Sequence, residues 1–168
     1  MRKFLPWIIA GAVVLFGYFY FKGINNTAVT LDQDVKESWG NVQTSYQRRN
    51  DLIGNLVKTV KGAADFEKST LEAVITARSK ATAVTIDPTN ITPEQLAQFN
   101  QAQSGVSSAL SRLLVTVEQY PDLKANQNFL KLQDELASTE NQILTARTRF
   151  NEAVKLYNRH VTIFPNNI

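Results

Sequence analysis

The fold of this chain is indicated most clearly by residues 35–62, which read VKESWGNVQTSYQRRNDLIGNLVKTVKG. Apolar side chains recur there at alternating steps of four and three, the heptad spacing of a helix that buries one stripe. The members of this stripe are Val35, Trp39, Val42, Tyr46, Arg49, Ile53, Leu56 and Val60. The stretch therefore predicts a helix of a bundle, and it raises the question of why one member, Arg49, is charged.

Three further apolar stripes with the same period follow. The four expected helices cover about residues 29–62, 65–84, 93–119 and 125–164. Gly62 followed by Asp65 marks the first turn, and Thr92 followed by Pro93 is a typical helix start. Short connections favour antiparallel neighbours. The sequence therefore predicts an all-α fold, with an N-terminal transmembrane helix followed by an antiparallel up-and-down four-helix bundle whose first and last helices are long.

The predicted transmembrane helix is residues 4–21, FLPWIIAGAVVLFGYFYF, which carry no charge. A helix of this length spans roughly 27 Å, close to the hydrocarbon thickness of a bilayer. The alternative is a cleaved signal peptide, whose apolar part is shorter and ends in small residues. Here the apolar part is longer and ends in aromatic residues, so we predict an uncleaved anchor in residues 1–23 and a helical-bundle domain in residues 24–168.

The basic residues of the chain are informative through their positions. Three of the 18, Arg2, Lys3 and Lys22, flank the apolar segment, and the remaining 15 balance the 15 acidic residues. A neutral remainder lacks the basic face that nucleic-acid binding requires, so no nucleic-acid partner is expected. The positive-inside rule favours a single-pass protein of the cytoplasmic membrane, with its N-terminus inside and residues 24–168 outside.

The sequence contains few of the residues that carry enzyme chemistry. It has no cysteine and one histidine, His160, which we interpret as structural. Metal sites need several convergent ligands, and neither a phosphate-binding glycine loop nor a nucleophile motif is present. We therefore predict a protein that is not an enzyme, with no catalytic residue, metal, cofactor or small-molecule substrate indicated.

The stripes also predict a polar layer inside the bundle. Counting residues from the distal turns places the polar stripe members at one depth along the helices. The expected members are Arg49, Gln103 and Thr139, with Arg78 and Glu140 close by. Because an unpaired buried guanidinium costs several kcal/mol, we expect Arg49 to pair with Glu140 or, failing that, with Asp51 or Gln103. The neighbouring Arg48 is expected to face solvent.

Two other features of the sequence have a structural and a functional interpretation. Asn151 and Asn158 lie seven residues apart, on one helix face, where they serve either as packed residues that fix register or as contacts for a partner. Packing is the interpretation that we favour. Residues 81–95, ATAVTIDPTNITPEQ, form the most loop-like internal stretch and are our candidate for a mobile partner-binding element.

Several stretches together resemble the LemA family. They are residues 35–62 quoted above, FEKSTLEAVITARSKA at 66–81, YPDLKANQNFLKLQDEL at 120–136 and RFNEAVKLYNRHVTIFPNNI at 149–168. The resemblance implies a bacterial single-pass membrane protein with a helical-bundle domain and no established catalytic activity. It also implies an accessory role in envelope upkeep, because family members are often encoded near membrane peptidases or proteins of the TPM type. One departure is Gly54, where family members usually carry proline.

Two functions are consistent with these features. The first is a membrane-tethered scaffold or adaptor that binds another envelope protein. The second is a structural protein that self-associates into a larger membrane assembly. The stripes do not distinguish them, since both functions bury the same apolar residues.

Overall fold

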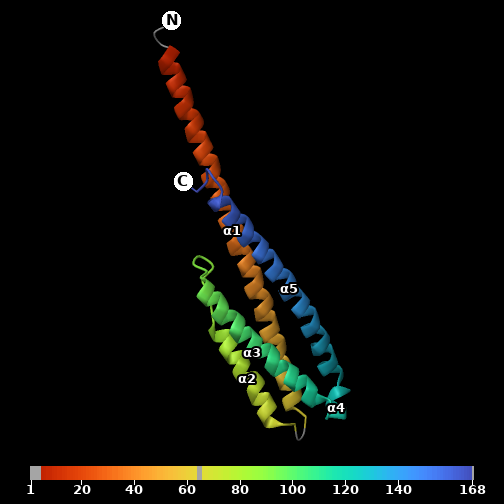
Figure 1. Ribbon diagram of the computed structural model, residues 1–168. Helices are drawn as coiled ribbons and strands as arrows, with labels where there is room; N and C mark the ends of the chain where they lie inside the picture. Colours follow the sequence, from red (N-terminus) through yellow and green to blue (C-terminus); the bar gives the residue numbers. More distant parts are fainter. Residues whose placement is uncertain (1–4, 64–65, 168) are drawn as a thin grey trace. The chain divides into compact units, whose positions relative to one another are not determined.

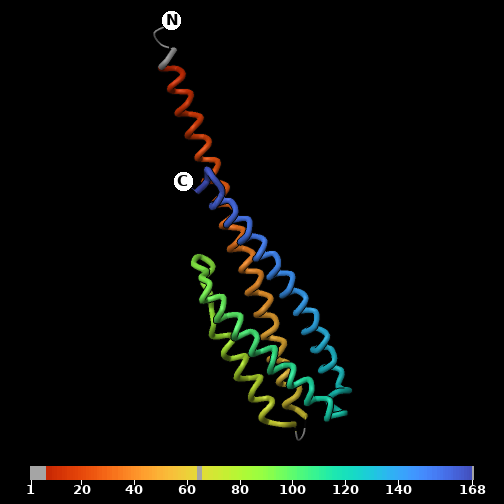
Figure 2. Tube along the Cα trace, in the orientation of Figure 1, coloured from red at the N-terminus to blue at the C-terminus, as the bar shows by residue number. Residues whose placement is uncertain are grey.

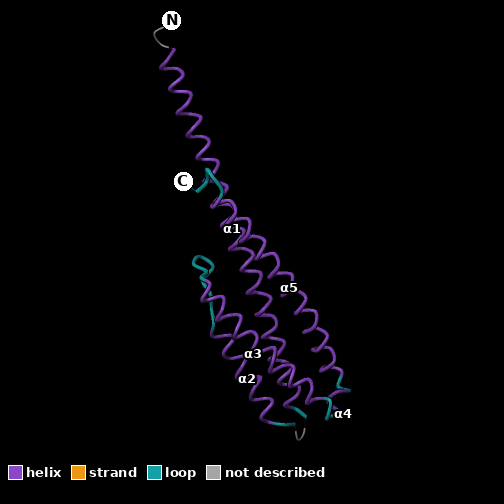
Figure 3. Tube along the Cα trace, in the orientation of Figure 1, coloured by secondary structure: helices purple, strands orange, loops and turns teal. Residues whose placement is uncertain are grey.

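The computed structural model describes residues 5–63 and 66–167, and this part of the chain is helical and contains no strand (Figure 3). Its helices are α1 (Leu5–Lys61), α2 (Lys68–Ala83), α3 (Pro93–Val117), α4 (Pro121–Lys124) and α5 (Gln127–Thr162). The four expected bundle helices correspond to α1, α2, α3 and α5, with α4 a single turn in the last connection (Figure 1). The predicted all-α fold with long first and last helices is confirmed.

The chain divides into two compact units. The bundle unit is Trp39–Arg147, and the paired-helix unit consists of the described residues of Met1–Ser38 together with those of Thr148–Ile168. Both α1 and α5 contribute to each unit. The predicted division between residues 1–23 and 24–168 concerns the membrane and stays a prediction.

Helix α1 differs from the expectation in its length. The sequence suggested a separate helix beginning near Val29, whereas α1 starts at Leu5 and continues unbroken to Lys61. No proline interrupts residues 22–29, and the Thr27 hydroxyl donates to the Gly23 carbonyl at 3.0 Å, the pattern of a hydroxyl accommodated within a helix. The predicted anchor and the first bundle helix are therefore one continuous element.

Local signals explain where the bundle helices begin. At α3 the predicted Thr92 cap is confirmed: Thr92 Oγ1 accepts from the Gln95 amide at 3.2 Å, and Gln95 Oε1 accepts from the Thr92 amide at 3.1 Å. At α5 the Asn126 Oδ1 accepts from the amides of Asn128 and Phe129, which sets the start of the helix. At α2 the cap position is Glu67, while Asp65 lies outside the described residues.

In the bundle unit, successive long helices reverse direction, and α2 and α3 lie side by side (Figure 2). The predicted stripes form the core, because nearly all of their members in this unit are buried. Val74 of α2 and Leu113 of α3 are fully buried with Ile53 of α1. Nearer the start of the unit, the Phe99 ring contacts Trp39 and Tyr46 edge-on, with centroid distances of 5.3 and 4.9 Å.

The paired-helix unit contains the most apolar stretch of the chain. Within Trp7–Lys61, α1 includes a stretch long and apolar enough to cross a membrane, and none of that stretch is buried. Trp7 and Phe16 are 78% and 74% exposed. The end of α5 lies beside α1, where His160 Nε2 is 3.1 Å from the Ile24 carbonyl oxygen.

Candidate functional site

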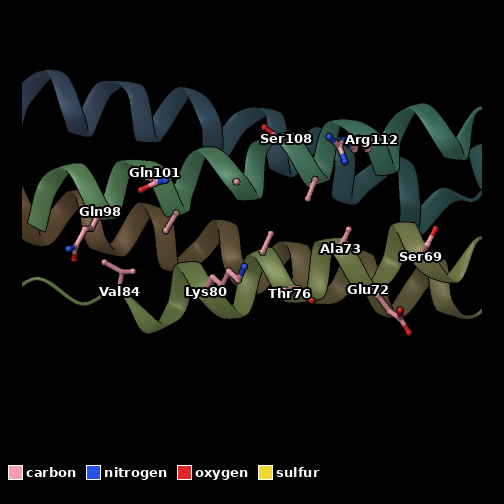
Figure 4. Close-up of a pocket in the computed structure, with 14 residues that line it drawn as sticks. Ser69, Glu72, Ala73, Thr76, Lys80, Val84, Gln98, Gln101, Ser108 and Arg112 are labelled. Atoms are coloured by element: carbon pink, nitrogen blue, oxygen red, sulfur yellow. The ribbon is translucent and has the colours of Figure 1, made fainter.

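A groove of about 770 Å³ runs along α2 and α3 on the surface of the bundle unit (Figure 4). Its α2 wall includes Ser69, Ala73, Thr76 and Lys80, which recur every three or four residues and so lie on one helix face. Its α3 wall has the same spacing, with Gln98, Gln101, Gly105, Ser108 and Arg112. The part of α2 that lines the groove, from Ser69 to Lys80, is roughly 17 Å long at the usual helical rise, and Val84 lines it just after the helix ends.

Small side chains make this groove hollow. Ala73 and Ala77 line it from α2, and Ala102, Gly105 and Ala109 line it from α3. At Gly105 no atom lies within 4 Å of the place where a Cβ would stand, so the space above this residue is open. Because the distance between packed helix axes depends on the side chains at the contact, a surface of this kind allows another helix to approach closely.

The groove carries an excess of positive charge. Glu72 pairs with Lys68, with 3.6 Å between the carboxylate and ammonium groups. Lys80 and Arg112 also line the groove, and neither makes an ion pair or a side-chain hydrogen bond with another described residue. The groove is therefore suited to a surface that supplies carboxylates.

A second feature of the bundle unit is a buried arginine. The Arg49 side chain is 3% exposed, and its Nη1 donates to Glu140 Oε1 at 2.9 Å and to Ser107 Oγ at 3.2 Å. Its Nη2 donates to Gln103 Oε1 at 2.5 Å and to the Gln103 carbonyl at 3.3 Å. We call these four residues the Arg49 cluster. They come from three helices, so the cluster ties α1, α3 and α5 together.

The surroundings of Arg49 offset the cost of burying its charge. The guanidinium lies 4.9 Å from the centroid of the Tyr46 ring, within the range of a cation–π contact. Glu140 supplies the neutralising carboxylate while remaining 47% exposed, so only one of the two charges is fully desolvated. Removing the Arg49 side chain should cost about 3–5 kcal/mol, because the buried Gln103 oxygen atoms would lose these donors and a cavity would remain.

Hydrogen bonds join Arg49, Gln103 and Glu140 of the predicted polar layer, whereas Thr139 and Arg78 bond to other groups. Thr139 is fully buried, yet its hydroxyl donates to the Glu135 carbonyl of its own helix at 2.8 Å. No hydrogen bond or ion pair joins Thr139 or Arg78 to Arg49 among the described residues. Counting residues along helices predicts which side chains share a depth, but it does not predict which hydrogen bonds they make.

Arg78 instead contacts α1 at the position where this chain departs from its family resemblance. Its Nε donates to the Asn50 carbonyl at 2.7 Å, and its guanidinium lies 3.2 Å from where a Cβ on Gly54 would stand. In an α-helix the amide of residue 54 donates to the carbonyl of residue 50, four positions earlier. A donor from α2 therefore reaches the carbonyl that a proline at position 54 would leave unpaired.

The remaining predicted residues are near the surface. Arg48 is exposed, as expected. Asn151 and Asn158 are also exposed, which does not fit the packed interpretation that we favoured, and their contact with a partner stays a prediction. In the loop before α3, Ile86 is 2% exposed and its carbonyl accepts from Gln43 Nε2 at 3.0 Å, so this part of the candidate mobile element is held against α1.

The sequence did not indicate two polar contacts. Ser107 lies four residues after Gln103, a spacing that could have added it to the layer. In the paired-helix unit, Asn166 Nδ2 donates to the His160 carbonyl at 2.9 Å and lies 3.3 Å from His160 Nδ1. The last residues are thereby joined to the end of α5. Among the described residues, no group of three or more His, Cys, Asp and Glu side chains is placed to hold a metal ion.

Comparison with known proteins identifies the family of this chain. The model of the LemA family matches residues 38–168, which is most of the sequence. This chain belongs to the LemA family. The match covers the whole bundle unit and ends with the last residue of the chain, so the resemblance to the LemA family is confirmed.

Individual relatives are between 25% and 30% identical to this chain over most of its length. Magnetosome protein MamQ 2 of Paramagnetospirillum magneticum is 30% identical over 159 residues, which covers 84% of this chain and 58% of that protein. Protein LemA of Metamycoplasma hominis is 25% identical over 150 residues, covering 89% of this chain and 65% of that protein. The chain thus spans about six-tenths of the length of these relatives. Their names state no reaction.

Proposed function

We propose that this chain is a membrane-anchored adaptor of the LemA type without catalytic activity, and that its bundle unit binds a helix of another envelope protein. The observation that carries the proposal is the groove between α2 and α3. It is long, it is lined by small residues, and it contains Lys80 and Arg112 without carboxylate partners among the described residues. The occupant that fits it is an amphipathic helix with a narrow apolar face and acidic residues along its edges.

The first part of α1 supports the anchoring. Apolar side chains on every side of the helix are exposed there, from Trp7 to Phe21, and no protein surface covers them in the described chain. Keeping apolar surface in water costs about 25 cal/mol per Å², which a lipid environment removes. The charge pattern supports a single pass through the cytoplasmic membrane, with the N-terminus inside and the bundle unit outside.

Photocrosslinking in native membranes tests the groove as the partner surface. A photoreactive amino acid replaces Thr76, which is exposed in the groove, and in a matched variant it replaces Ser138, which is exposed on α5 outside the groove. We expect one discrete product with a foreign protein from position 76 and none from position 138. Equal products from both positions, or none from either, would contradict the proposal.

A second variant checks that the product depends on the shape of the groove. Gly105→Leu places a side chain into open space, so it fills the groove while leaving the core intact. We expect this variant to lose the foreign product, and the control Ser138→Leu to keep it. A product of twice the mass of the chain would instead support self-association into a larger assembly, which is the alternative function.

A further inference from the structure

The four residues of the Arg49 cluster also line a second hollow, which shares no lining residue with the groove. It has a volume of about 350 Å³ and lies between α1, α3 and α5 of the bundle unit. Arg49 and Tyr46, both buried, contribute to its lining from α1. The side chains that matter below come from the other two helices: Asn100, Ser104, Glu140, Leu144 and Arg147. We call this hollow the Arg49 pocket.

The charges that line the Arg49 pocket do not balance. Arg49 and Arg147 carry two positive charges, and Glu140 carries the one negative charge among the lining residues. Glu140 is already committed to Arg49 through the 2.9 Å contact. Arg147 makes no ion pair with another described residue. The pocket therefore has room for one more negative charge, and that charge would sit beside Arg147.

The pocket also contains hydrogen-bond donors that have no acceptor. The side chains of Asn100 and Ser104 have no hydrogen-bond partner among the described residues, and Arg147 has all its N–H groups available. Arg49 Nε is buried and also lacks an acceptor in the described part of the chain. Of these unpaired groups, Arg147 and Arg49 Nε can only donate, while Asn100 and Ser104 can donate or accept. An acceptor-rich group is the missing element.

The pocket also has an apolar side. Leu144 is 66% exposed at its edge, and Ile143 lines it below. The Tyr46 ring also lines the pocket, with its centroid 4.9 Å from the Arg49 guanidinium. A ligand that carried only charge would leave this side uncovered, whereas an aliphatic group beside the charge would cover Leu144.

We propose that the Arg49 pocket binds a carboxylate that is attached to an aliphatic group, as at the end of an acylated amino acid or a peptide chain. A carboxylate matches the single excess charge, and its planar pair of oxygens suits the fork of the Arg147 guanidinium. Asn100 and Ser104 complete its hydrogen bonds. The Arg49–Glu140 pair already demonstrates a carboxylate on a guanidinium in this pocket. This site does not depend on the proposed function of the α2–α3 groove.

The carboxylate of Glu140 makes a specific prediction possible for a variant that lacks its charge. Because Glu140 lies in the same pocket, it repels an incoming carboxylate and competes for the same donors. Glu140→Gln keeps the shape and an acceptor for Arg49 Nη1 but removes the negative charge. This variant is expected to bind the ligand more tightly than the unmodified chain, whereas Arg147→Gln is expected to bind it more weakly.

Nuclear magnetic resonance titration of the full chain in detergent micelles tests the site. The probe is N-acetyl-L-leucine, and its amide, N-acetyl-L-leucinamide, is the matched uncharged compound. We expect saturable shifts of the Asn100 side-chain amide and the Arg49 Nε–H with the acid and none with the amide. Arg147→Gln should raise the Kd at least tenfold, as expected for loss of the charge-assisted contact with the guanidinium, and Glu140→Gln should lower it.

Controls separate this site from general anion binding. Arg48→Gln removes an exposed arginine that lines a different hollow, so it should leave the Kd unchanged. Inorganic phosphate should bind more weakly than N-acetyl-L-leucine, because it does not cover Leu144. The proposal is overturned by an absence of saturable shifts, by equal binding of the amide, by tighter binding of phosphate, or by an unchanged Kd in Arg147→Gln.

Discussion

The two parts of α1 use apolar residues in opposite ways. Before Lys22 the helix exposes them on all sides, and Phe16 is 74% exposed. After Ser38 the same helix buries one stripe, in which Ile53 and Leu56 are 0% exposed, and presents polar residues elsewhere. One continuous helix therefore passes from a surface that needs an external apolar environment to a surface that makes its own core.

The difference lies in the pattern of the side chains and not in the helix itself. A stripe of apolar residues is satisfied by neighbouring helices of the same chain, as in the bundle unit. An unstriped apolar segment has no polar side to present to water, so only lipid or another protein can cover it. The periodicity of apolar residues therefore predicts whether a helix is buried within its own bundle or needs lipid or another protein to cover it.

The largest expected effect comes from placing the same charge in each part of α1. Ile53→Lys puts an ammonium group into the fully buried core and should destabilise the bundle by more than about 4 kcal/mol. Val14→Lys lies in the exposed apolar segment and should leave unfolding of the bundle in detergent unchanged. Thermal unfolding followed by circular dichroism measures both.

The Val14→Lys variant should reveal its cost in the membrane instead. A lysine at the centre of a transmembrane helix costs about 2.5–3.5 kcal/mol of insertion free energy. We therefore expect a larger share of this variant than of the unmodified chain to be released from membranes by alkaline extraction. Equal unfolding temperatures for the two lysine variants would break the comparison between the two parts of α1.

The next largest effect concerns the one charged member of the buried stripe. Arg49→Ala removes the guanidinium that joins α1, α3 and α5, and should cost about 3–5 kcal/mol in the free energy of unfolding. Arg48→Ala, at the exposed neighbouring position, should change it by less than about 0.5 kcal/mol. Urea unfolding of the two variants provides the measurement, and similar values for both would place Arg49 outside the structural core.

Much of this architecture could be predicted from the sequence, because heptad spacing constrains which face of a helix is buried. The stripe from Trp39 to Val60 is buried at every member. Counting residues from the distal turns also predicted that Arg49, Gln103 and Glu140 lie at the same level of the bundle. The hydrogen-bond partners of Thr139 and Arg78, the contact of His160 with Ile24 and the groove did not follow, since each depends on how side chains turn and helices pack.

A smaller loss of stability is expected from a proline substitution in α1 where α2 contacts it. On propensity scales, replacing glycine by proline within a helix costs about 2 kcal/mol. A Cβ at position 54 would stand 3.2 Å from the Arg78 guanidinium, the end of a flexible side chain that can shift by a few tenths of an ångström while Nε still donates to the Asn50 carbonyl. Gly54→Pro should therefore cost roughly 1 kcal/mol less than Gly40→Pro. Gly40 has no atom within 4 Å of its Cβ position, which makes it a suitable control. If Gly54→Pro and Gly40→Pro lost the same stability, the Arg78 hydrogen bond would not compensate for the amide that proline removes.

The smallest effect is expected at the end of α5. Asn166→Ala removes the side-chain hydrogen bond to the His160 carbonyl, a loss of about 1 kcal/mol that stays local. Amide hydrogen exchange of residues 160–163 should become faster, while exchange in the bundle unit stays the same. Asn167→Ala, at an exposed neighbouring position, should leave both unchanged. Faster exchange throughout the bundle would contradict the local role of Asn166.

The measurement that tests the central claim most directly is single-cysteine labelling along α1 in native membranes. The chain contains no cysteine, so each introduced thiol reports on one position. With a membrane-impermeant maleimide, we expect no labelling from residue 8 to residue 20. From residue 39 to residue 60 we expect labelling with helical periodicity, strong at exposed positions such as Gln47, Arg48 and Asp51 and absent at Tyr46, Ile53 and Leu56. Labelling throughout residues 8–20, or the same reactivity at every position from 39 to 60, would contradict the account.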